Sequence, residues 1–166
     1  MSHRSGRGAA PSADGLDEDA WQCLTAAILA ANREDGNGMA MYIRRFEALG
    51  DDKFDAASRY LWYLLRFRVV YLLRRRPTAE DLHVLASRTY PRYRQVVRES
   101  VIKLEDTLRA YFRLPLVGSQ LTAGRWFVSA TAALGVLLDD PIAELAVIRP
   151  DLAEWRSRDT LDGAPE

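Results

Sequence analysis

The stretch of sequence that decides the fold is DKFDAASRYLWYLLRFRVVYLLRR, residues 52–75. Its apolar side chains recur at helical spacing but point to nearly every side of the axis, as Tyr60, Leu61 and Leu64 do. A helix that is apolar on most sides belongs in a protein interior. The sequence therefore predicts a long, mostly buried central helix over about 52–75.

The segments before this helix also have helical spacing. Asp17 is a good N-cap with two acids behind it, and predicts a helix that runs to about Asn32. After a glycine-containing turn at 34–38, apolar residues recur at steps of three and four until Gly50, a residue that suits a helix end. Two helices are expected before the central one.

Two further helices are expected after it. Thr78, with an acid three residues later, nearly matches a capping box and predicts a short helix to about Arg88. Pro91 then suits the first turn of a long amphipathic helix over about 91–112. Two i,i+4 ion pairs are expected on the outer face of that helix: Glu99 with Lys103, and Glu105 with Arg109.

The C-terminal third predicts a helix over about 122–138 and shorter pieces beyond it. Small residues such as Ala133 and Gly135 would let the backbone of that helix approach a neighbour closely. Asp140 and Pro141 predict the start of a short helix, which Pro150 would separate from a last turn.

These patterns predict an all-α protein, a single helical-bundle domain of six to eight helices. Its 166 residues are 48% apolar, which is enough for one sizeable core. The domain is expected over 16–156. A disordered tail is expected over 1–15, where large apolar residues are nearly absent, and a mobile acidic tail over 157–166.

Composition argues against several classes of protein. Neither apolar run, 60–73 or 126–138, reaches the roughly 20 residues that a bilayer requires, so no membrane role is expected. A single cysteine, Cys23, and two histidines, His3 and His83, offer no disulfide and no metal-ligand spacing. We therefore expect a cytoplasmic protein with no cofactor, no metal and no catalytic residues.

Two arginines within the central helix require partners if that helix is buried. Arg66 or Arg68 should form a structural ion pair, because an unpaired buried charge is very costly. An alternative is that Arg66 and Trp62 grip a small anionic ligand in a pocket.

The charges are distributed unevenly along a chain of net charge zero. Between residues 66 and 98 there are nine arginines and two acids, whereas residues 139–166 hold eight acids and three arginines. The two regions are expected to compensate each other across the fold or between subunits. The arginines that would otherwise form a polyanion or acidic-partner patch are Arg74, Arg75, Arg76, Arg88, Arg92, Arg94 and Arg98.

The functional hypothesis from sequence is a non-catalytic interaction or regulatory protein that binds another protein or itself, with a homodimer as one expected state. Two alternatives remain open. The arginine cluster over 74–98 would serve a nucleic-acid-associated protein, and the pocket near Trp62 and Arg66 would serve an anion-binding domain or an enzyme. The first hypothesis requires an exposed apolar patch, the second requires arginines on one face, and the third requires a cavity.

Overall fold

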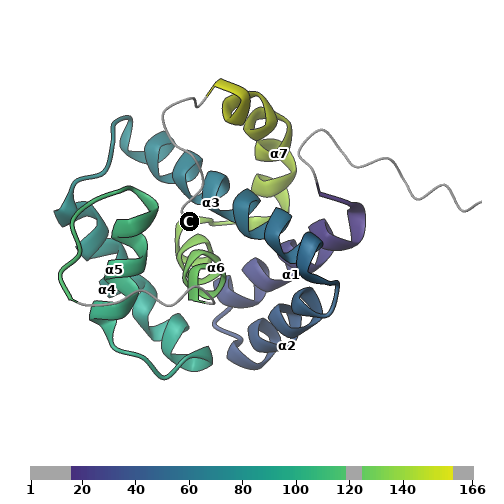
Figure 1. The fold of residues 1–166 in the computed structure, drawn as a ribbon, viewed down its shortest axis with the longest axis horizontal. Coiled ribbons are helices and arrows are strands. Elements are labelled where there is room, and N and C mark those ends of the chain that lie inside the picture. The colour runs from purple at the N-terminus through teal and green to yellow at the C-terminus, as the bar shows by residue number, and fades with distance from the viewer. Residues whose placement is uncertain (1–15, 119–124, 159–166) are drawn as a thin grey trace, which may run out of the picture.

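The computed structural model describes residues 16–118 and 125–158, which form seven α-helices and no strand (Figure 1). The helices are α1 (Glu18–Asn32), α2 (Gly36–Glu47), α3 (Asp51–Leu73), α4 (Ala79–Val96), α5 (Val101–Tyr111), α6 (Arg125–Leu137) and α7 (Pro141–Arg158). The all-α bundle expected from the sequence is confirmed. The tail expected over 1–15 lies outside the described residues, as does that over 157–166 beyond Arg158.

The first two helices begin at aspartate caps. The Asp17 side chain accepts a hydrogen bond from the N–H of Ala20 at 2.8 Å, and Lys53 forms an ion pair with it at 2.8 Å. The lysine holds the pKa of that carboxyl below its ordinary range. Asp35 accepts from the N–H of Gly38 at 2.9 Å, so α2 starts at Gly36, inside the stretch expected to be a turn. A side-chain acceptor thus caps a helix whose first turn contains two glycines.

Helix α6 lies at the centre of the bundle, where it contacts α1, α3, α4 and α5 (Figure 1). Every residue from Phe127 to Gly135 is buried. Small side chains make this burial possible, because they allow neighbouring backbones to approach from several sides. The backbone of Gly135 lies so close to α1 that an added Cβ would be 2.7 Å from the Cβ of Ala31. The close approach expected from the small residues of this helix is therefore present.

Helix α3 crosses the bundle above α6 and is buried through its middle but not at its end. Its buried residues include Tyr60, Leu61 and Leu64, whereas Tyr71 is 50% exposed and Leu72 is 47% exposed. The apolar pattern of α3 therefore passes from core to surface in its last turn. In the described ranges, no helix is long and apolar enough to cross a membrane.

The helices expected to divide at Pro91 are arranged differently. Helix α4 starts at the Thr78 capping box, as predicted, but continues through Pro91 to Val96. A proline inside a helix removes one backbone hydrogen bond, and here packing of α4 against α2, α5 and α6 maintains the helix despite that loss. The expected boundary at Arg88 was wrong.

The prediction of one long amphipathic helix over 91–112 was also wrong, because the chain turns between α4 and α5. Val97 is extended, with φ −126° and ψ 120°, and Ser100 begins α5 by accepting from the N–H of Lys103 at 3.3 Å. Two adjacent β-branched valines followed by a serine cap are a signal for this break. The apolar spacing continues across the turn, which is why periodicity alone did not reveal it.

Pro150 is likewise inside a helix rather than between two pieces. Helix α7 runs without interruption from Pro141 to Arg158. The Asp140 side chain begins it by accepting from the N–H of Ala143 at 3.4 Å, consistent with the start expected at Asp140 and Pro141. Proline suits the first turn of a helix, as at Pro141, but the presence of a proline does not by itself decide where a helix of this chain ends.

Candidate functional site

The exposed end of α3 is shaped by a left-handed residue and an ion pair. Arg74 has φ 58°, and its N–H donates to the carbonyl of Val70 at 2.8 Å, which ends the helix. Arg75 then binds both carboxylate oxygens of Asp81, at 2.6 and 3.1 Å. This guanidinium, together with the N–H of Thr78, holds the pKa of the Asp81 carboxyl far below its ordinary value. The turn therefore has a defined shape and displays three consecutive arginines, all exposed.

A groove of about 290 Å³, the α3–α4 groove, lies on one side of this helix end. Its apolar walls come from Val69, Leu72 and Leu73 on α3 and from Val84 and Leu85 on α4. Leu72 and Val84 are 47% and 48% exposed. Charged residues at its rim are Glu80, Asp81 and Arg88.

Two adjoining cavities lie on the other side of the same helix end and share Phe67 and Tyr71, whose rings stack with centroids 6.1 Å apart. One cavity, of about 300 Å³, reaches α7 at Val147 and Asp151, and the other, of about 360 Å³, reaches Arg74 to Arg76. We call them together the α3–α7 groove. Val147 is 70% exposed, so this groove too presents apolar surface to solvent.

An ion pair joins α3 to α7 at the edge of that groove. Arg68 donates to the Glu144 carboxylate at 2.7 Å, and both side chains are largely buried, at 12% and 25% exposed. The expectation that Arg66 or Arg68 forms a structural ion pair is confirmed for Arg68. It is also one point at which an acid of the 139–166 region compensates an arginine of the 66–98 region.

Arg66 and Trp62 are both buried. The Arg66 guanidinium lies over the Trp62 ring, 4.5 Å from its centroid, and 5.7 Å from that of Phe112. Neither Arg66 nor Trp62 lines the α3–α4 groove or the α3–α7 groove. Cation–π contacts of this kind stabilise a buried guanidinium.

The seven arginines proposed as a patch do not share one face. Arg75 lies near Arg88, because Asp81 lines the α3–α4 groove with Arg88 and also binds Arg75, whereas Arg74 and Arg76 line the α3–α7 groove. Arg92 points elsewhere, donating to the carbonyl of Ala31 at 3.0 Å. Arg94 is exposed but six residues after Arg88, which places it about 120° round the helix. Arg98 is exposed in the turn beyond α4.

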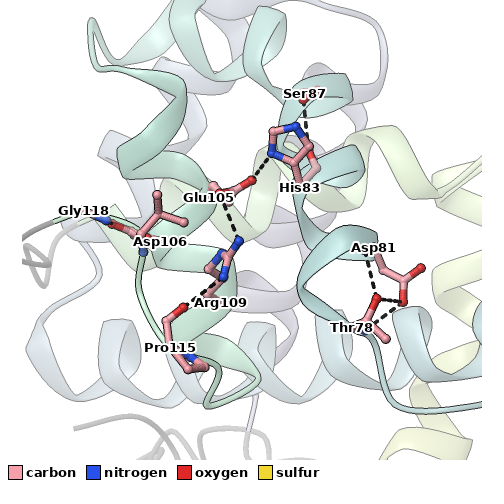
Figure 2. Close-up of polar contacts among 10 residues, drawn as sticks. Thr78, Asp81, His83, Ser87, Glu105, Asp106, Arg109, Pro115 and Gly118 are labelled. Carbon is pink, nitrogen blue, oxygen red and sulfur yellow. Dashed lines mark hydrogen bonds and ion pairs between the residues drawn. The ribbon is translucent and has the colours of Figure 1, made fainter.

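A second polar cluster, which sequence reasoning missed, lies where α4 packs on α5 (Figure 2). His83 Nδ1 contacts the Glu105 carboxylate, whose other oxygen lies 3.4 Å from the Arg109 guanidinium (Figure 2). Arg109 also donates to the carbonyl of Pro115 at 3.1 Å. The pair of Glu105 with Arg109 was predicted, but on the outside, whereas Glu105 is only 6% exposed. The i,i+4 spacing was visible in the sequence, while the burial depends on α4.

The neighbouring carboxylate, Asp106, is also buried and holds a loop in place. It accepts from the N–H of Val117 at 2.6 Å and from that of Gly118 at 2.8 Å. Ser87, one turn beyond His83, donates to the backbone carbonyl of His83 at 2.9 Å and not to its ring (Figure 2). His83, Glu105, Arg109 and Asp106 therefore hold one part of the fold against another, whereas the Ser87 bond stays within α4.

Among the described residues, no three histidine, cysteine, aspartate or glutamate side chains gather in a way that could hold a metal ion. The chain matches no protein-family model, no curated protein and no solved structure.

Proposed function

We propose that this chain is a non-catalytic protein-interaction domain that docks a segment of a partner protein in the α3–α4 groove. The observation that supports it is an apolar groove that is open to solvent at an ordered helix end. Leu72 and Val84 line it, and each leaves nearly half of its surface exposed. Clustered exposed aliphatic residues beside a groove are typical of a surface that binds another protein.

The charges at this end of α3 favour an acidic partner. Arg75 and Asp81 neutralise each other. Among the other charged residues, Arg88 and Glu80 line this groove, and Arg74 and Arg76 lie in the adjoining turn. A groove between two helices suits an amphipathic helix, whose apolar residues at steps of three and four would enter it. We therefore expect a partner segment with a leucine- or phenylalanine-type anchor and neighbouring aspartate or glutamate residues.

Selection from a library of random peptides tests this proposal. Enriched peptides should combine an apolar anchor with acids three or four positions away. Binding of a synthetic enriched peptide, measured by fluorescence anisotropy, should weaken roughly tenfold or more for Leu72→Asp and for Val84→Asp. Arg88→Glu should weaken it and reduce its salt dependence, because a favourable rim charge is reversed.

Ile102→Asp is the matched control for the two aspartate variants. Ile102 is 50% exposed, as Leu72 and Val84 nearly are, but it lies on α5 and lines neither groove. All three variants should retain the thermal stability of the parent chain. Equal binding by all of them, or enrichment of peptides without acids, would contradict the proposed docking site.

Duplex DNA and heparin test the alternative partner class. We expect no binding at roughly 0.15 M salt, where the Debye length is about 8 Å and scattered arginines act almost independently. Micromolar binding that falls steeply with salt, and that is lost when Arg74, Arg75 and Arg76 become alanine, would instead identify a polyanion-binding protein.

A further inference from the structure

The α3–α7 groove has opposite charges at its two sides. Its α3 end carries Arg74, Arg75 and Arg76, while its α7 side carries Asp151, which is exposed. The acid nearer the middle, Glu144, is already paired with Arg68. Within the described part of the chain, neither Arg74 nor Asp151 has an ion-pair partner, and Arg74 instead lies over the Tyr71 ring at 4.8 Å. One positive and one negative group therefore remain at the rim.

The middle of the same groove is apolar. Phe67 and Tyr71 form a stacked aromatic pair on α3, and Val147 faces solvent on α7 with 70% of its surface exposed. In the described ranges, Val147 is the most exposed of the large apolar residues. A surface with aromatic and aliphatic residues at its centre and charges at its rim has the composition of a protein interface.

We propose that the α3–α7 groove binds a second copy of this chain about a twofold axis, with Arg74 of each copy beside Asp151 of the other. A twofold interface pairs one surface with itself, so it requires a patch that is self-complementary. Rotation by 180° about the middle of this groove places its basic end over its acidic side twice. The apolar residues of the two copies, Tyr71 and Val147 among them, then meet near the axis.

This partner differs from the one proposed for the α3–α4 groove in the chemistry that the surface requires. The acidic segment proposed for the α3–α4 groove would meet Arg88 there, whereas the α3–α7 groove offers both signs at Arg74 and Asp151. A purely acidic partner would leave Asp151 beside a like charge. A second copy provides both an arginine and an aspartate in the required positions.

Sedimentation equilibrium of the full chain, at low and moderate salt, measures the self-association directly. We expect a reversible dimer. Val147→Asp should weaken it roughly a hundredfold or more, because the variant places a charge near the middle of the interface. Ile102→Asp, a similar change at an exposed site on α5, should leave it intact. Peptide binding in the α3–α4 groove should survive Val147→Asp, so the two proposals can fail separately.

Charge exchange between copies is the sharper test. Arg74→Glu and Asp151→Arg should each weaken the homodimer roughly tenfold, since each creates two like-charge contacts. An equal mixture of the two variants should restore association, because both cross-contacts then join opposite charges. Restoration would be strongest at low salt.

Any of the following results would overturn the proposal. The first is a parent chain that is monomeric throughout the concentration range. The second is a dimer that Val147→Asp does not affect, or a variant mixture that associates no better than its components. The third is a monomer that dimerises only when residues 159–166 are removed, since the chain's own tail would then be the occupant of the groove.

Discussion

At the scale of single residues, Gly135 lets α6 approach α1 closely. An added Cβ would lie 2.8 Å from both the carbonyl carbon of Ala31 and the backbone nitrogen of Asn32. Backbone atoms cannot move aside as a flexible side chain can. Asn32 reinforces the contact by donating to the carbonyls of Gly135 and Leu138 at 3.0 and 2.7 Å. The α1–α6 junction therefore depends on having no side chain at this position.

Gly135→Ala should lower the free energy of unfolding by about 1 to 3 kcal/mol, the usual cost of overpacking a core. Chemical denaturation measures it. Helix propensity alone predicts the opposite sign, a gain of about 1 kcal/mol from replacing glycine by alanine in a helix interior. A variant as stable as the parent chain would therefore show that α1 and α6 are further apart than described.

Thr78 and Asp81 make a second prediction at this scale. Their capping box begins α4, and Thr78→Ala should cost about 1 kcal/mol of stability. Asp81→Asn should lower the melting temperature at neutral pH. The pKa of Asp81 is lowered in the fold from its ordinary value of 3.8, so its contribution is present above that pH and is lost as the pH falls further.

Thermal melts of Asp81→Asn at neutral and acidic pH check this dependence. The difference from the parent chain should shrink below about pH 3.8. Glu80→Gln is the control, because Glu80 is also an acid in the first turn of α4 but takes no part in the capping box. If Glu80→Gln lowers the melting temperature as much as Asp81→Asn does, the effect comes from the helix dipole rather than from the cap and the ion pair.

At the scale of elements, two prolines that were expected to divide helices lie inside them. Pro91 and Pro150 both lie inside helices, while Pro141 occupies the first position of one. The break between α4 and α5 falls instead at residues 97–100, after two valines and before the Ser100 cap. Tertiary packing supplies the stability that an interior proline removes.

Pro91→Ala should raise the free energy of unfolding by about 1 to 3 kcal/mol, because an alanine restores a helical hydrogen bond at an exposed position. Pro141→Ala is the matched control and should give no such gain, since proline is well suited to the first turn. Equal effects of the two substitutions would mean that α4 is interrupted at Pro91. Denaturant unfolding distinguishes these results.

At the scale of the whole molecule, the helices are unequally attached. Helix α6 contacts four neighbours, whereas α7 makes its main contacts with α1 and α3 only. Several of the contacts that hold α7 to the bundle are polar. Arg68 pairs with Glu144, and Arg149 lies over the Trp21 ring at 4.4 Å and donates to the carbonyl of Leu16 at 3.3 Å.

Hydrogen exchange should therefore show that the amides of α7 open at lower free energy than those of α6. Glu144→Gln should destabilise α7 by about 1 to 3 kcal/mol, since it leaves Arg68 largely buried without its carboxylate. Exchange in α6 should change less. Equal acceleration in both helices would show that the bundle opens as one unit.

The sequence by itself determined the helical class, the caps at Asp17 and Thr78, and the small-residue face of α6. Each of these depends on neighbours within a few residues, where periodicity and capping chemistry act directly. The sequence also showed that an arginine within the buried helix needs a partner, because an unpaired buried charge is costly whichever residue would pair with it.

Only the tertiary structure decided how the apolar surface is divided between core and grooves. Tyr71 and Leu72 continue the same apolar pattern as Leu64, yet they are exposed because the bundle ends there. The burial of Glu105 and the separation of Arg92 from Arg74 depend likewise on which helices pack against α4 and α5. Helical spacing shows which residues share a side, but long-range packing decides whether that side meets another helix or solvent.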